Sequence, residues 1–103
     1  MNISTELRKT MYHNLTTIIG ITKVDNYDEL IQWADEASRL YGELVKKHLE
    51  GITDADLHNQ LKNTFIRATQ IMPASMIYDI ADMLEFIEEN PFCKLRPLEG
   101  IRN

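Results

Sequence analysis

Cysteine is nearly missing from this sequence of 103 residues, in which Cys93 is the only one. A single cysteine cannot form a disulfide within the chain, so a disulfide-stapled scaffold is excluded and a reducing compartment is favoured. Long apolar runs are also missing, because none approaches the roughly 18–20 residues that span a bilayer. The first nine residues lack the apolar stretch of a secretory signal. We therefore expect a cytoplasmic protein without a membrane segment.

Basic residues are fewer than acidic ones. The chain has 11 Lys and Arg against 16 Asp and Glu, which gives a formal net charge of −5. This balance disfavours direct nucleic-acid binding, which usually leaves a basic footprint. The four glycines are isolated, so no glycine-rich phosphate loop is present. None of the three histidines follows a glutamate by three residues, as di-iron bundle motifs require. We expect no metal, no cofactor and no catalytic residue.

Apolar residues instead recur at steps of three and four, which predicts amphipathic helices over residues 5–19, 27–49, 53–72 and 74–89. The short connectors between these ranges favour antiparallel neighbours. We therefore predict an all-α fold, a small antiparallel bundle of about four helices over residues 1–90, followed by an extended C-terminal tail over 91–103. The predicted helix caps are Ser4 for the first helix, Asp25 or Asn26 (the latter with Glu29 in a capping box) for the second and Thr53 for the third. The predicted stops are Gly20 and Gly51.

The negative charge is concentrated in one part of the chain. Residues 1–67 are nearly balanced, whereas residues 68–93 contain five acids and no Lys or Arg. Asp82, Glu85 and Glu89 are spaced i, i+3 and i+7, which places them on one ridge of the last helix. Such a ridge is a solvated face, a docking face for a cationic partner surface, or an imitation of nucleic-acid phosphates.

The C-terminal tail has a different period. Phe92, Leu95, Leu98 and Ile101 recur every three residues, and Arg96 adds positive charge among them. Pro91 before this stretch and Pro97 within it exclude a long α-helix, and a polyproline II conformation has three residues per turn. An apolar strip of this kind needs a cover, either the chain's own bundle or another protein.

Two acidic segments resemble a known enzyme family. Residues 33–40 read WADEASRL and residues 78–84 read YDIADML, similar to the paired acidic helices of the all-α nucleotide pyrophosphohydrolases of the MazG type. That resemblance implies Mg²⁺-dependent nucleotide hydrolysis with the ligands Asp35, Glu36, Asp79 and Asp82. The sequence departs from the family pattern at Arg39, a cation where a second carboxylate belongs, and at Asp79, which stands in place of a glutamate.

Two function classes therefore remain open. The first is a small non-enzymatic protein-binding module, an adapter or inhibitor of another macromolecule of the kind that phages and mobile elements encode. Its partner is another protein, and a homo-oligomer is an open alternative. The second is the Mg²⁺-dependent nucleotide hydrolase. The predicted partner-binding residues of the first class are Asp82, Glu85, Glu89, Phe92, Leu95, Arg96, Leu98 and Ile101.

Overall fold

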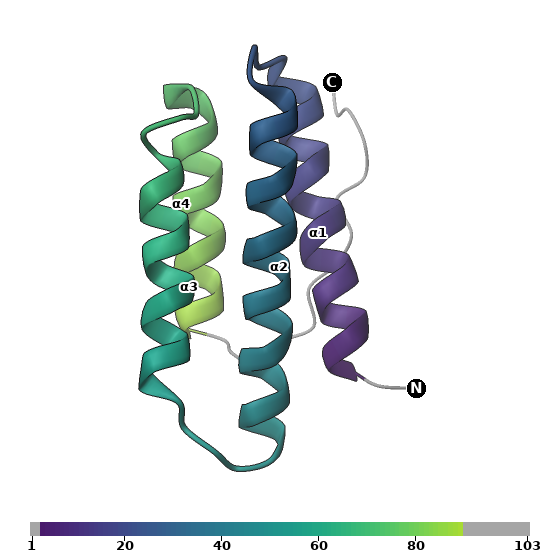
Figure 1. Cartoon of the computed structure of the whole chain (residues 1–103), viewed down its shortest axis with the longest axis vertical. Helices are drawn as coiled ribbons and strands as arrows, with labels where there is room; N and C mark the ends of the chain where they lie inside the picture. Colours follow the sequence, from purple (N-terminus) through teal and green to yellow (C-terminus); the bar gives the residue numbers. More distant parts are fainter. Residues whose placement is uncertain (1–2, 90–103) are drawn as a thin grey trace.

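The chain folds into four α-helices in the computed structural model, which describes residues 3–89 (Figure 1). Within this range, side chains are described for all residues except 84 and 86–89. The helices are α1 (Ile3–Thr22), α2 (Tyr27–Leu49), α3 (Ala55–Ala68) and α4 (Ala74–Glu89), and no strand occurs between residues 3 and 89. The all-α prediction is confirmed, whereas the predicted boundary at residue 90 and the tail over 91–103 lie outside the described residues.

The helices form an antiparallel bundle in which each one runs opposite to the one before it (Figure 1). α1 packs on α2, α2 on α3 and α3 on α4, and α4 closes the bundle by packing on α1. Among the described residues, the diagonal pairs α1–α3 and α2–α4 have no Cα atoms within 8 Å of each other. The connectors are only four or five residues long, which keeps sequence neighbours side by side and confirms the predicted bundle.

The predicted limits of α1 are wrong at both ends. Ser4 is buried inside the first turn rather than capping it. Gly20 does not end the helix, which continues to Thr22, where the hydroxyl donates to the carbonyl of Ile18 over 2.7 Å. The turn follows at Lys23, whose φ of 57° is left-handed. The left-handed conformation that often ends a helix is thus adopted by Lys23, three residues after the glycine expected to adopt it.

The predicted limits of α3 also need correction. Asp54, not Thr53, is the N-cap, and its carboxylate accepts a hydrogen bond from the Leu57 amide over 2.9 Å. A carboxylate gains more there than a hydroxyl, because it also interacts favourably with the helix dipole. The helix ends at Ala68 rather than at Met72. The chain tightens into a turn before Pro73, since a proline disfavours helical backbone in the residue before it.

The predicted capping box of α2 does not form. Asn26 is the N-cap residue, but its side chain makes no capping hydrogen bond to the backbone of its own helix. Its amide Nδ2 instead donates to the carbonyl of Ile71 over 2.7 Å and to Oε1 of Glu29 over 3.2 Å. Asn26 therefore links the α1–α2 connector to the α3–α4 connector, which lie at the same end of the bundle (Figure 1).

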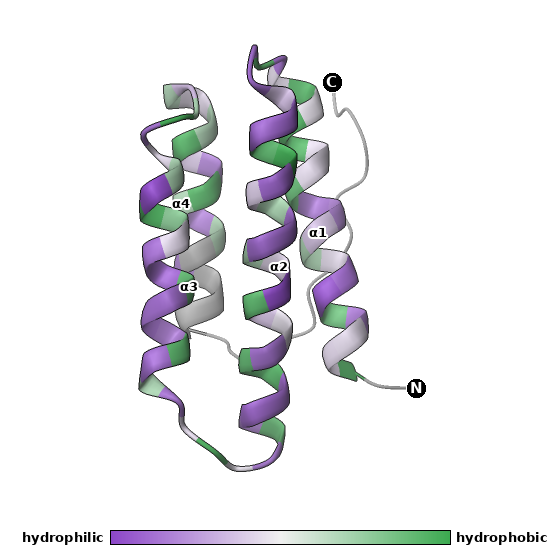
Figure 2. Cartoon of the chain, in the orientation of Figure 1, coloured by the Kyte–Doolittle hydropathy of each residue, from purple (hydrophilic) through white to green (hydrophobic). Residues whose placement is uncertain are grey.

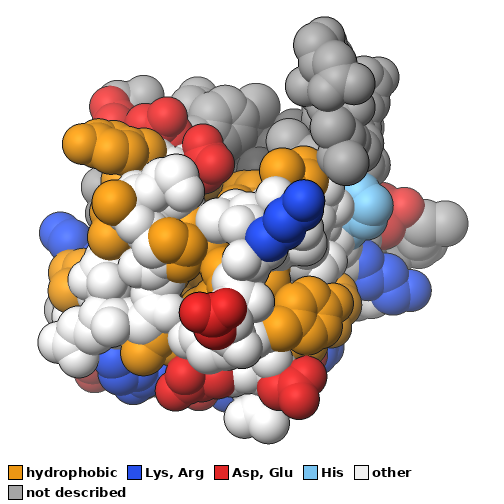
Figure 3. Space-filling model, turned by 90° about the horizontal axis from the view of Figure 1, so that it is seen from above, with side chains coloured by type: hydrophobic (Ala, Val, Ile, Leu, Met, Phe, Trp, Pro, Cys, Tyr) orange, Lys and Arg blue, Asp and Glu red, His pale blue; other side chains and the backbone are white. Residues whose placement is uncertain are grey.

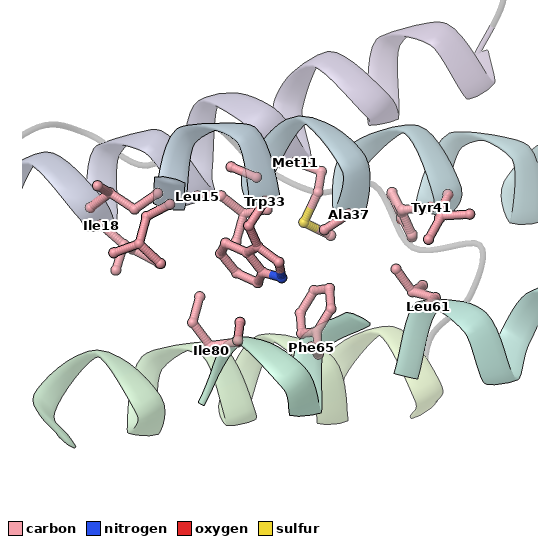
Figure 4. Packing of buried hydrophobic residues seen from close by; sticks show 14 of the residues in the cluster. Met11, Leu15, Ile18, Trp33, Ala37, Tyr41, Leu61, Phe65 and Ile80 are labelled. Atoms are coloured by element: carbon pink, nitrogen blue, oxygen red, sulfur yellow. The ribbon is translucent and has the colours of Figure 1, made fainter. Parts of the chain in front are cut away.

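The hydrophobic core lies between all four helices. Figure 2 shows hydrophobic residues recurring between polar ones along each helix, and the inward residues form a single cluster. At its centre the Trp33 and Phe65 rings meet edge to face, with centroids 5.7 Å apart (Figure 4). The indole Nε1 donates to the carbonyl of Thr64 over 2.9 Å, so the buried polar atom of Trp33 is satisfied.

The buried position of Phe65 predicts a large loss of stability when its side chain is shortened to that of alanine. Phe65 is 2% exposed, whereas the next residue, Ile66, is 53% exposed. Phe65→Ala should lower the free energy of unfolding by about 3–5 kcal/mol, because it leaves a cavity beside Trp33. Ile66→Ala is the matched control and should change it by less than about 0.5 kcal/mol. Denaturant titration followed by circular dichroism measures both, and equal losses for the two variants would contradict the described packing.

Replacing glycine by alanine should change the stability in opposite directions at Gly20 and Gly51. Gly20 lies within α1 and a Cβ there would meet nothing within 4 Å, whereas Gly51 has a φ of +77°. Gly20→Ala should stabilise the fold by about 0.5–1 kcal/mol, because alanine loses less backbone entropy in a helix. Gly51→Ala should destabilise it by about 1 kcal/mol, because the left-handed conformation strains an L-residue. Thermal unfolding compares the two, and a shift of the same sign for both would refute this assignment.

Candidate interaction surfaces

The outer face of α4 combines an exposed aromatic residue with carboxylates. Tyr78 is 74% exposed, the most exposed large hydrophobic side chain among the described residues. Asp82 and Glu85 follow it at i+4 and i+7 and are exposed, as is Asp79 beside it. Figure 3 shows acidic and hydrophobic side chains adjoining on the left, the side of the bundle where α3 and α4 lie. We call Tyr78, Asp79, Asp82 and Glu85 the acidic face.

The predicted partner-binding residues divide into two groups. Asp82 and Glu85 lie together on the exposed side of α4, as the ridge predicts. The side chain of Glu89 and the whole of the tail, with Phe92, Leu95, Arg96, Leu98 and Ile101, lie outside the described residues. Tyr78 is a surface residue that the sequence reading did not single out. The spacing of the apolar residues in α4 leaves Tyr78 outside the buried face, and this spacing could have identified it as exposed.

The four carboxylates of the enzyme resemblance are not brought together. Glu36 belongs to the α2–α3 interface, where its Oε1 accepts from Arg67 Nη2 over 2.8 Å and from the Thr64 hydroxyl over 3.4 Å. Asp35 lines a groove on the α1 side of α2. Asp79 and Asp82 lie on α4, which is diagonal to α2 and has no described Cα atom within 8 Å of it. Among the side chains that the structure describes, no three of His, Cys, Asp or Glu gather as a metal site.

A hollow of about 350 Å³ lies between α2 and α3. The edge of Trp33 and Ala68 lie at this hollow, and two glutamates and two glutamines line it as well. The Glu36–Arg67 ion pair joins its two sides. The third charged group, Glu29, accepts a hydrogen bond from Asn26 Nδ2 over 3.2 Å, so each charged side chain of this lining has a described partner. The lining residues are Glu29, Gln32, Trp33, Glu36, Arg67, Ala68, Gln70 and Ile71.

A second groove runs between α1 and α2 on their outer side. It consists of two adjoining hollows of about 330 and 190 Å³, which share Thr5 and Arg8. We call it the basic groove, because its charged lining is four cations and two carboxylates: Arg8, Lys9, Arg39 and Lys46 with Asp35 and Glu43. The sequence reading missed this groove. The available signal was the row of small residues at Ala34, Ser38 and Gly42, which lets a neighbouring helix approach closely.

Comparison with known proteins adds no family to this description. No family model matches the chain, and no curated protein or solved structure shows significant similarity to it. Among the described helices, none is long and apolar enough to cross a membrane. The functional argument therefore depends on the surfaces themselves.

Proposed function

We propose that this chain is a small helical protein-binding module without catalytic activity, acting as an adapter or inhibitor of another macromolecule. Its docking surface is the acidic face of α4 together with the C-terminal segment 91–103. We further propose a cytoplasmic location, which the presence of only one cysteine and hence no internal disulfide favours. We also propose an origin in a phage or other mobile element, in keeping with the small acidic chain.

The observation that supports this proposal is the exposure of Tyr78 among carboxylates. A tyrosine with most of its ring in solvent gains little for the fold, yet tyrosine is among the residues that dominate binding energy at interfaces. The carboxylates Asp79, Asp82 and Glu85 are exposed on the same helix, and residues 68–93 contain five acids and no Lys or Arg. A partner surface with basic residues fits this combination, since charge complementarity speeds association and the ring provides buried area.

Charge reversal on α4 tests the docking surface. In Asp82→Lys/Glu85→Lys, binding of a basic partner should weaken about tenfold or more, because attraction becomes repulsion at two positions. Affinity capture from the native cell extract, quantified by mass spectrometry, measures the loss for each captured protein. The matched control is Asp28→Lys/Glu50→Lys, which makes the same charge change at an exposed position in the first turn of α2 and at its exposed C-cap residue. α2 is the helix diagonal to α4.

Capture that is equally strong for the α4 variant and for the unmodified chain would remove α4 from the docking surface. Equal losses in the α4 variant and in the α2 control would show that only the net charge matters. Both outcomes contradict the proposal.

Removing residues 92–103 tests the second part of the docking surface. The described core is formed by residues between Ile3 and Met83, all of which the truncated chain keeps. The truncated chain should therefore retain most of its helical circular dichroism. Partner capture should be abolished, because the apolar strip at Phe92, Leu95, Leu98 and Ile101 is lost with its basic residues. A truncated chain that still captures the same proteins in the same amounts would refute a role for this segment.

A further inference from the structure

The floor of the basic groove is formed where α1 and α2 approach most closely. A Cβ added at Gly42 would lie 2.9 Å from the Arg8 Cβ and 3.3 Å from its Cγ and Cδ. The aliphatic part of Arg8 therefore lies directly across Gly42, in space that any other residue would occupy. Glycine at this position fixes where the Arg8 side chain crosses the groove.

The charges along this groove do not cancel. Arg8 and Lys9 on α1 and Arg39 and Lys46 on α2 line it, against the carboxylates of Asp35 and Glu43. The one ion pair described among them, Arg39 Nη1 to Glu43 Oε1, spans 3.9 Å between side chains that are each about half exposed. An exposed pair of that length contributes little. The groove thus has a local positive excess on a chain whose net charge is −5.

We propose that the basic groove binds the acidic face of a second copy of this chain. The two surfaces have opposite charge, and their lengths agree. Arg39 and Lys46 are seven residues apart on α2, and Tyr78 and Glu85 are seven residues apart on α4, so each pair spans about 10 Å along its helix. Anchors at i, i+4 and i+7 are those with which one helix docks in the groove between two others.

Tyr78 adds an apolar anchor to this contact. The larger hollow of the groove is lined by Tyr12, which is 37% exposed, and by the Arg8 and Lys9 side chains. A tyrosine ring that enters there from α4 of the other copy meets an aromatic neighbour and two cations. Both contacts favour the ring once water is removed.

The contact has to join two copies, because one copy cannot fill its own groove. α4 packs between α1 and α3, whereas the groove opens on the outer side of α1 and α2. Each copy therefore offers one groove and one acidic face to different neighbours. Such head-to-tail contacts produce closed rings or open chains.

This inference uses the same acidic face as the proposed function but does not require any foreign partner. It is tested with the purified chain of 103 residues alone. Sedimentation velocity should give a weight-average mass that rises above 12.0 kDa with protein concentration. Raising the ionic strength from about 0.1 M to about 1 M, which shortens the screening length from about 10 Å to about 3 Å, should return it to the monomer mass.

Charge variants identify the two halves of the contact. Arg39→Glu/Lys46→Glu and Asp82→Lys/Glu85→Lys should each sediment as monomers, whereas Asp28→Lys/Glu50→Lys should behave as the unmodified chain. An equimolar mixture of the first two variants should associate again, because one keeps an intact acidic face and the other an intact groove. Restored association also shows that both variants are folded.

Three outcomes would overturn the inference: an unmodified chain that stays at 12.0 kDa at every concentration, groove variants that associate as before, or a mixture that remains monomeric. Failure of the proposed function looks different. In that case self-association persists while no captured protein depends on α4. The groove variant separates the two further, since it should lose self-association and keep partner capture.

Discussion

The contact between Trp33 and the middle of α3 is the interaction on which the arrangement of the bundle depends. The chain can be viewed as two antiparallel helical hairpins, α1–α2 and α3–α4, which meet where α2 packs on α3. The Trp33 ring packs against Phe65, and its Nε1 donates to the Thr64 carbonyl. This contact combines burial with a directional hydrogen bond, so it fixes both the depth and the register at which the hairpins meet. Asn26 reinforces the same register at one end through the carbonyl of Ile71.

Once the hairpins meet in this way, the positions of the charged surfaces follow. α4 closes against α1 and becomes diagonal to α2. The carboxylates of α2 and α4 are thereby kept apart, and Glu36 is engaged by Arg67 and Thr64 at the α2–α3 interface. The same geometry leaves the acidic face of α4 and the basic groove of α1 and α2 open on different sides. The described bundle thus presents two surfaces of opposite charge rather than one acidic cluster.

The sequence predicted most of the helices correctly and some of their ends wrongly. The limits of α2 and α4 agree with the apolar period, whereas Gly20 lies inside α1 and Asp54, not Thr53, caps α3. The free energies of ending a helix at one residue or at the next differ little, so tertiary context can outweigh the local preference. Asn26 shows why local sequence patterns do not suffice. Its side-chain amide donates to the carbonyl of Ile71, which is 45 residues away in the chain.

By itself the sequence determined that this protein is a helical bundle and that its excess of acidic over basic residues is concentrated on the last helix. Both follow from local periodicity, since apolar and acidic residues three and four apart share a helix face whatever surrounds them. Only the tertiary structure decided which faces meet. It separated the carboxylates of the enzyme resemblance, and it brought Arg8 of one helix over Gly42 of the next to form the basic groove. Contacts between helices depend on packing register, which residue spacing within a single helix does not contain.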